Sequence, residues 1–374
     1  MPLIVIYNPV SGDRTAAKLT TDVILPLLAT HNLTPDRVAA TEHAGHAGEI
    51  LLSYIDSLAL STRTEPITLV LASGDGTLHE VANALHSARS KQEISFPSLR
   101  IALIPGGTAN ALHATFFPPS TSSTAEPTLL ASLLSFLSAN QRLVPLTFAY
   151  TTISSSPPVL PDSTNPDKLP PTSLSAPAFE SSDVISAVVT STALHAAILH
   201  DSEELRASVP GVERYTLAAE QNATTWYRAR VRLLSPVQRY DVTTSTFIDV
   251  VEKEETQLEF HDSFSYFLST VNVDRLEPHF RIAPLQRTLP PAPGAQTIDV
   301  LFIRPLRDPS LEGKSGEGER ERFKERVWSV LNGAYQDGAH VKARYDSQDG
   351  KTDGLPVVEY FRVGGWEWIP VRLP

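Results

Sequence analysis

Three glycine-containing loops hold the residues that are best suited to bind a ligand or to catalyse a reaction. They read Asn8-Pro9-Val10-Ser11-Gly12, Ser73-Gly74-Asp75-Gly76-Thr77 and Pro105-Gly106-Gly107-Thr108-Ala109-Asn110. Glycine lets a backbone approach a phosphate closely, and the amides and dipole at a helix N-terminus favour an anion. The three loops therefore predict a binding site for the phosphates of a nucleotide.

Asp75 is the unusual residue of the second loop. A carboxylate beside a phosphate site is repelled unless it contacts a metal ion or accepts a proton, so its position indicates a general base or a Mg²⁺ contact. The alternative is that Asp75 caps a helix N-terminus. The chain has neither the G-x-x-x-x-G-K-[ST] loop nor the protein-kinase H-R-D and D-F-G motifs, which excludes those two classes of nucleotide site.

Each loop follows a run of residues that is typical of a strand. The first 145 residues alternate β-branched runs with helical stretches, a pattern that predicts a parallel sheet covered by helices. The expected strands are Leu3–Tyr7, Arg37–Thr41, Ile67–Ala72 and Arg100–Ile104. Open α/β sheets bind ligands at the carboxyl ends of their strands, so the loops are expected to meet there.

The rest of the chain has a different pattern. Residues 151–182 hold 8 Ser, 4 Thr and 7 Pro, which predicts a disordered insertion between an α/β domain at 1–145 and a second domain at 183–374. Short apolar runs separated by Pro, Gly and Asp predict that the second domain is mostly antiparallel β-structure. These runs are Val184–Val189, Trp226–Leu234, Ser263–Val271, Thr297–Ile303, His340–Tyr345 and Val357–Val363.

Composition limits the classes of function. The 374 residues are enough for two domains, and the formal net charge of −11 disfavours nonspecific binding to nucleic acid. The absence of cysteine excludes a thiolate nucleophile and a disulfide framework, and it fits a reducing compartment. No stretch approaches the roughly 18 uninterrupted apolar residues of a spanning helix, so we expect a cytoplasmic protein without a transmembrane segment.

Together the three loops resemble the diacylglycerol kinase catalytic family, which includes sphingosine and ceramide kinases and is related to NAD kinase. The motifs are N-P-x-S-G at Asn8–Gly12, S-G-D-G-T-x-x-E-V-x-N at Ser73–Asn83 and P-G-G-T-A-N-A at Pro105–Ala111. The resemblance implies an α/β domain followed by a β-sandwich domain that shapes a lipid site. It also implies an ATP- and Mg²⁺-dependent kinase, peripherally associated with a membrane, whose substrate is a lipid.

The resemblance assigns roles to individual residues. Asp75 is the implied catalytic base, Glu80 structures its loop, and no residue is assigned as a metal ligand. Arg206 and Arg214 match two arginines that contact the nucleotide phosphates in related lipid kinases. The remaining implied nucleotide contacts are Asn8, Ser11, Thr41, Gly74, Gly76, Gly106, Gly107, Thr108 and Asn110.

Two departures from the family pattern leave alternatives open. Ala197 and Leu199 stand where sphingoid-base kinases carry acids, which favours ceramide or diacylglycerol over a long-chain base. The C-terminal Asp-Gly-Glu triplet of the family is missing, and Glu367 is its possible substitute. An NAD kinase-like enzyme and a catalytically inactive lipid- or nucleotide-binding member are the alternatives. His43 and His46 are expected to begin a helix rather than to hold a metal ion.

Overall fold

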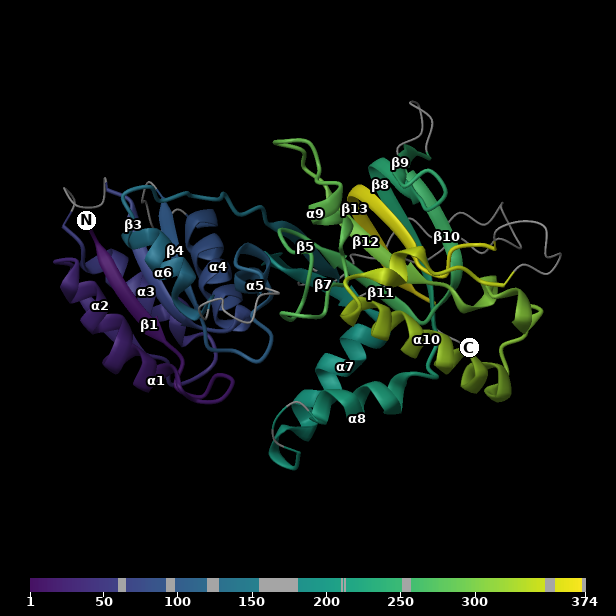
Figure 1. Cartoon of the computed structure of the whole chain (residues 1–374), viewed down its shortest axis with the longest axis horizontal. Helices are drawn as coiled ribbons and strands as arrows, with labels where there is room; N and C mark the ends of the chain where they lie inside the picture. The colour runs from purple at the N-terminus through teal and green to yellow at the C-terminus, as the bar shows by residue number, and fades with distance from the viewer. Residues whose placement is uncertain are drawn as a thin grey trace, which may run out of the picture.

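The computed structural model describes residues 1–59, 65–91, 98–119, 128–154, 181–209, 211, 213–250, 257–346 and 354–371. The N-terminal part forms an α/β domain, and the C-terminal part forms a β-rich domain beside it (Figure 1). Both expectations for the fold class, an α/β domain with a parallel sheet and a mainly antiparallel second domain, are confirmed.

A four-stranded parallel sheet organises the N-terminal domain. Its strands are β1 (Leu3–Tyr7), β2 (Arg37–Ala40), β3 (Ile67–Ser73) and β4 (Leu99–Pro105), in the order β2-β1-β3-β4. All four begin and end within one or two residues of the expected bounds. The two central strands are buried along almost their whole length, as their continuous apolar sequences require.

Helices cover both faces of this sheet. They are α1 (Ala16–Leu19), a π turn (Thr20–Ile24), α2 (Leu25–Thr30), α3 (His46–Ser57), α4 (Asp75–Ser90), α5 (Ala111–Phe116) and α6 (Ala131–Leu137). On one face α3 and α4 pack on Ile4 and Ile6. On the other face α2 and α6 pack on Leu3 and Val5. The period of two along β1 thus separates two apolar layers.

The C-terminal domain is built on one antiparallel sheet in the order β10-β8-β13-β12-β11-β7, with β9 beside β8. Its strands are β7 (Val189–Thr192), β8 (Tyr227–Asp241), β9 (Thr246–Asp249), β10 (Gln257–Phe264), β11 (Tyr266–Thr270), β12 (Ile298–Ile303) and β13 (Glu359–Pro370). Its helices are α7 (Ala193–Glu204), α8 (Glu213–Asn222), α9 (Leu285–Thr288) and α10 (Glu317–Tyr335).

This sheet bends over itself and encloses its own core. A bulge interrupts the pairing of β13 with β8 between Val363 and Gly365. Beyond the bulge, Trp366 and Trp368 reach Phe267 on β11, with ring centroids 5.0 and 5.2 Å apart. The sandwich-like core is therefore made by one curved sheet rather than by two separate ones.

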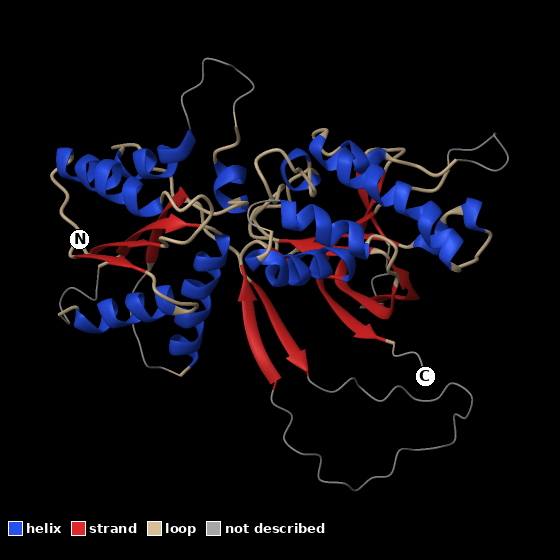
Figure 2. Ribbon diagram, turned by 90° about the horizontal axis from the view of Figure 1, so that it is seen from below, coloured by secondary structure: helices blue, strands red, loops and turns tan. Residues whose placement is uncertain are grey.

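The elements expected from the sequence differ from the structure at several places. Residues 340–345, expected as a strand, contain the short 3₁₀ helix Ala339–Lys342, which follows Gly338 in the left-handed conformation. The stretch 151–182, expected to be a disordered insertion, forms strands at both of its ends. Strand β5 (Ala149–Ser154) pairs with β6 (Ser181–Ser186) in a separate two-stranded ribbon that projects from the junction of the domains (Figure 2). Residues 155–180 lie outside the described residues.

Hydrogen bonds join the two domains. The side chain of Asn83 on α4 binds the backbone of Ile185 on β6 twice, at 2.9 Å in each direction. Asn272 in the C-terminal domain binds both backbone groups of Thr147 in the same manner. Among the described residues, no helix is long and apolar enough to span a bilayer.

Candidate functional site

The three glycine-containing loops converge at the carboxyl edge of the parallel sheet. They follow β1, β3 and β4, which are adjacent strands that point the same way. The amide of Gly106 in the third loop donates to the Ser73 carbonyl of the second at 3.1 Å. The convergence predicted from the sequence is therefore present.

Close packing of backbone on backbone explains most of the glycines. Gly12, with φ of +51°, lies against the third loop, where an added Cβ would come 2.5 Å from the Gly106 oxygen. A Cβ on Gly107 would come 2.5 Å from the Gly74 Cα. Gly76 differs, because a Cβ there would meet nothing within 4 Å. It leaves open space beside Asp75, where a ligand can approach.

Side-chain hydrogen bonds hold the loops in shape. Asn8 Nδ2 donates to Thr77 Oγ1 at 3.3 Å, which joins the first loop to the second, and Thr77 also contacts the Ser73 hydroxyl. In the third loop, Asn110 accepts from the Gly107 amide at 2.8 Å and donates to its carbonyl at 2.6 Å. Asn8 and Asn110 therefore order the loops, in addition to any contact with a ligand.

Asp75 is the first residue of α4, and its half-buried carboxylate binds the start of α5. Oδ2 accepts from the Ala111 amide at 2.6 Å, and Oδ1 accepts from the Leu112 amide at 3.3 Å. Burial raises the pKa of the Asp75 carboxyl above its ordinary value, although these two amides oppose the shift. The capping alternative thus describes a real contact, but Asp75 caps a neighbouring helix rather than its own.

Three further expected contact residues lie around these loops. Thr41 is buried at the end of β2, where its amide donates to the Tyr7 carbonyl at 2.9 Å. Ser11 is half-buried, and its hydroxyl lies 3.7 Å from the position of a Cβ on Gly74. Thr108 is exposed on the third loop. Their hydroxyls are the neutral donors that a phosphate or ribose requires.

Two residues of α4 connect the site to its surroundings. Glu80 is half-buried, and its carbonyl packs on Gly48 of α3, where an added Cβ would lie 3.2 Å away. Asn83 belongs to the same motif, and the sequence alone gave it no role. Because its amide pairs with Ile185 as a neighbouring strand would, Asn83 positions the C-terminal domain relative to the helix that begins with Asp75.

The two arginines expected at the phosphates have other partners. Arg206 is exposed and forms an ion pair with Glu203 at 3.0 Å. Arg214 on α8 is 6% exposed, and its guanidinium donates to the Gly211 carbonyl at 2.7 Å and to the Tyr215 hydroxyl at 3.1 Å. Within the described part of the chain, no hydrogen bond or ion pair joins either arginine to the three loops.

Two other residue groups from the sequence analysis have structural partners. Glu367 on β13 forms an ion pair with Arg232 at 3.0 Å within the C-terminal sheet, so it is engaged away from the loops. The rings of His43 and His46 stack with centroids 4.6 Å apart, and His46 Nδ1 accepts from the Glu42 amide at 3.0 Å. These contacts order the start of α3.

Comparisons with known proteins agree with the fold. Residues 2–135 match the family model described as the diacylglycerol kinase catalytic domain. A "putative diacylglycerol kinase" from Bacillus anthracis str. Sterne has a similar structure, with a TM-score of 0.50, 13% identity and coverage of 99% of this chain and 86% of that one. A second structure from that organism, with the same description, has a TM-score of 0.47 and 12% identity over 99% of this chain and 87% of that one.

No curated protein matches the sequence. At 13% identity the structural similarity establishes the shared fold, and the family match covers the part of the chain that carries all three loops. The N-terminal segment, residues 2–135, is therefore similar to the diacylglycerol kinase catalytic domain.

Proposed function

We propose that this protein is an ATP- and Mg²⁺-dependent lipid kinase that phosphorylates a primary hydroxyl group of a ceramide, a long-chain base or a diacylglycerol. One observation carries the proposal. Three glycine loops pack against one another at one sheet edge, and the only acidic residue among them, Asp75, lies beside the open space at Gly76.

The donors of these loops suit a nucleotide polyphosphate. The amides of Asp75 and Gly76 begin α4 and have no acceptor within the helix, so they can donate to an anion. Ser11 adds a hydroxyl, and Gly76 adds room for close approach. When bound, ATP supplies the γ-phosphoryl group and Mg²⁺ neutralises the charge on its oxygens.

Asp75 is the proposed proton acceptor. Its Oδ1 is the freer oxygen, because its 3.3 Å bond to the Leu112 amide is long, whereas Oδ2 is held at 2.6 Å by Ala111. Burial raises the pKa of Asp75, which makes its carboxylate a stronger base toward a substrate hydroxyl.

The surroundings of α7 favour an uncharged lipid headgroup. Ala197 and Leu199 are apolar, and the nearby Asp201 already binds His200 at 2.9 Å and the Asn222 amide at 2.6 Å. A protonated amine would therefore find no unpaired carboxylate at these three positions. Ceramide and diacylglycerol fit this environment better than a free long-chain base does.

Replacement of Asp75 by asparagine tests the chemistry. We expect Asp75→Asn to lower kcat by about 10²–10⁴-fold, the usual contribution of a general base, while Mg-ATP still binds. For the wild type, kcat/KM is expected to fall as the pH drops through the raised pKa of Asp75, because the protonated acid cannot accept a proton. Labelled ATP with a panel of ceramide, sphingosine, diacylglycerol and NAD measures both effects. The exposed Asp22→Asn variant is the control.

A folded Asp75→Asn protein that retains normal turnover would remove Asp75 from the reaction. Phosphorylation of NAD alone in the same panel would replace the lipid kinase with an NAD kinase-like activity. Because the control keeps the loops intact, it separates a chemical effect from general damage to the protein.

The second candidate is a nucleotide- or lipid-binding protein without kinase activity. It is favoured by the contacts of Asp75, whose two oxygens both accept amides, and by the pairing of Arg206 and Arg214 away from the loops. Calorimetry with Mg-ATP, together with the lipid panel, separates the two candidates. Binding without turnover on any lipid would establish the inactive member.

A further inference from the structure

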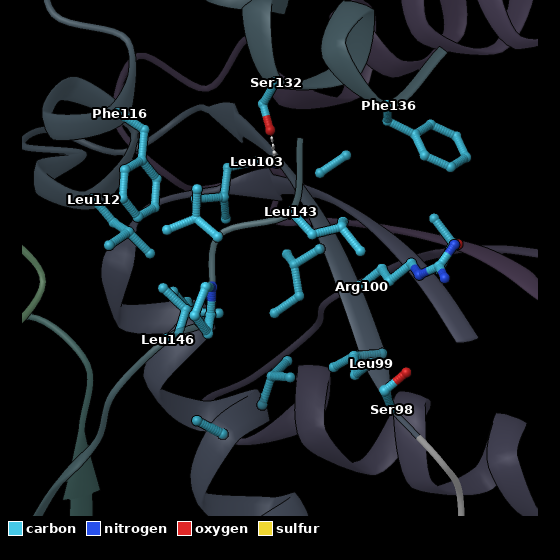
Figure 3. Close-up of a pocket in the computed structure, with 18 of the residues that line it drawn as sticks. Ser98, Leu99, Arg100, Leu103, Leu112, Phe116, Ser132, Phe136, Leu143 and Leu146 are labelled. Atoms are coloured by element: carbon cyan, nitrogen blue, oxygen red, sulfur yellow. Dashed lines mark hydrogen bonds between the residues drawn. The ribbon is translucent and has the colours of Figure 1, made fainter. Parts of the chain in front are cut away.

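An apolar cavity of about 740 Å³ lies beside the edge strand β4, outside the three loops. Its walls come from α4, α5, α6, β4 and the segment between Gln141 and Phe148. Leu103 and Leu143 meet near its centre, with Leu112 and Phe116 on one side and Arg100 on the other (Figure 3). The volume is within the range of about 300–1,000 Å³ that is usual for small-molecule sites.

The titratable residues of this cavity are all basic. His86, Arg89, Arg100 and Arg142 line it, and no aspartate or glutamate occurs among its described lining residues. This is unexpected in a chain with a net charge of −11. An apolar interior with several cations at its border matches a molecule that has a hydrocarbon chain and an anionic headgroup.

The segment that forms one wall can adapt to such a chain. Between Gln141 and Phe148 the backbone is neither helix nor strand, and Leu143, Val144 and Phe148 are 60, 48 and 41% exposed. Within the described part of the chain, Asn272 hydrogen-bonds this segment at Thr147, and Leu146 packs against the main core. Apolar side chains left in water on a loosely held wall are typical of a surface that gains contacts when an apolar ligand enters.

The basic end of the cavity is distant from the loops. Arg100 lies near the start of β4, five residues before Pro105, and the third loop begins where β4 ends. At about 3.3 Å per residue, the two ends are about 17 Å apart along the strand. An anionic headgroup held at Arg100 is therefore too far from Asp75 to be the group that is phosphorylated.

The other end of the cavity contacts α5, the helix whose first amides bind the Asp75 carboxylate. Leu112 and Phe116 line the cavity, while the amides of Ala111 and Leu112 bind the Asp75 carboxylate. The same helix reaches the C-terminal domain through Thr115, whose hydroxyl donates to Asp274 at 3.3 Å. A ligand that presses on Leu112 therefore acts directly on the hydrogen bonds of Asp75.

We propose that this cavity is an effector site for a long-chain amphiphile with an anionic headgroup, separate from the nucleotide loops. The hydrocarbon chain lies against Leu103, Leu143 and Leu146, and the headgroup is bound by Arg100 and Arg142. The proposal does not depend on the identity of the kinase substrate, because the five side chains named as holding the ligand have no role in the proposed reaction.

Direct binding to the purified full chain tests this site. The probes are oleate, 1-oleoyl lysophosphatidate, monoolein and glycerol 3-phosphate, each below its micelle concentration and each with and without Mg-ATP. We expect saturable binding of both anionic chains, at least about tenfold weaker binding of monoolein, and none of glycerol 3-phosphate. Comparison of oleate with lysophosphatidate shows whether the headgroup is a carboxylate or a phosphate.

Two variants locate the ligand. The double variant Arg100→Gln/Arg142→Gln is expected to raise the Kd of both anionic chains about tenfold and to leave monoolein unchanged. Leu143→Asp is expected to weaken the binding of oleate, lysophosphatidate and monoolein, because it places a carboxylate in the apolar wall. Arg287→Gln and Leu217→Asp, at exposed positions of the C-terminal domain, are the matched controls. Hydrogen exchange is expected to slow at β4 and α5 when oleate binds.

Several results would overturn the proposal. Equal binding of monoolein and oleate would show that the cavity does not recognise an anionic headgroup. Binding of glycerol 3-phosphate would indicate a phosphate site that needs no hydrocarbon chain. Competition by Mg-ATP would show that the ligand binds at the nucleotide loops and not in this cavity. Failure of all four probes to bind would dismiss the cavity as a site, whether or not the protein proves to be a lipid kinase.

Discussion

At the scale of single residues, the glycines of the three loops have two different roles. Gly12, Gly74, Gly106 and Gly107 allow one backbone to lie on another, whereas Gly76 keeps space free beside Asp75. The sequence motif does not distinguish these roles, because both kinds of glycine occur within five residues of each other. Replacing the two kinds of glycine by alanine should therefore change the free energy of unfolding in opposite directions.

A pair of alanine substitutions tests this distinction. Gly107→Ala is expected to destabilise the N-terminal domain by about 1–3 kcal/mol, because its methyl group would come 2.5 Å from the Gly74 Cα. Gly76→Ala, in the first turn of α4, is expected to gain up to about 1 kcal/mol and to lose affinity for Mg-ATP. Urea unfolding followed by far-ultraviolet circular dichroism, with calorimetry, measures both. Equal losses of stability would contradict the assignment.

Residue types predicted where the three glycine-containing loops lie because their sequence signals are local. Asp75 and its flanking glycines are contiguous, so their spacing alone placed them at a helix start. The partners of Asp75 could not be predicted in this way. Ala111 and Leu112 are 36 and 37 residues away, and only the packing of α5 against the second loop brings their amides to the carboxylate.

At the scale of elements, helix α4 links the loop that contains Asp75 to the second domain. It begins with Asp75 and, two turns later, presents Asn83 to the backbone of Ile185. Asn83 satisfies both backbone groups of Ile185, as a paired strand would. This side chain and the contact of Thr115 with Asp274 therefore help to position the C-terminal domain relative to the Asp75 carboxylate.

Removal of the Asn83 amide tests this link. Asn83→Ala leaves two backbone groups of Ile185 without a partner, and we expect a loss of about 1–3 kcal/mol in unfolding free energy. Hydrogen exchange at the Ile185 amide is expected to accelerate. Ser87→Ala, one turn further along the exposed side of α4, is the control. Unchanged exchange at Ile185 in Asn83→Ala would show that other contacts hold the domains.

The strands of the first domain could be predicted because their signal is strong. Leu3–Tyr7 was expected with its observed bounds, since it is a continuous apolar run at the centre of a parallel sheet. Helix α7 was missed because the apolar stretch Ile185–Leu199 has no clear helical period. Strand β8 extends past the expected end at Leu234 through Pro236 to Asp241, since pairing with β9 and β13 outweighs the proline.

At the scale of the whole molecule, the C-terminal domain depends on a buried histidine. His340 is 2% exposed and packs on Gly333 of α10, while its Nε2 donates to the Ile282 carbonyl at 2.9 Å. Burial lowers the pKa of His340 to about 4, against the ordinary value of 6.5. The unfolded chain therefore binds a proton at a higher pH than the folded one does.

This difference predicts how stability changes with pH. The contribution of neutral His340 to the free energy of unfolding is fully present above pH 6.5. It is lost as the pH falls toward 4, at about 1.4 kcal/mol per pH unit. All four tryptophans lie in the C-terminal domain, so tryptophan fluorescence in urea measures its unfolding. The difference in stability between wild type and His340→Gln is expected to shrink over this range, whereas His31→Gln, at an exposed site, serves as control. A constant difference would contradict the prediction.

The ribbon of β5 and β6 is a place where residues can be inserted into the chain. Ser154 and Ser181 face each other as the last pair of an antiparallel ladder, so the chain leaves and returns at nearly the same place. The ribbon pairs with neither of the two larger sheets. We expect that replacing residues 155–180 with a tight turn or with a reporter protein preserves the register of every other strand, so the ribbon offers a site for attaching new sequence.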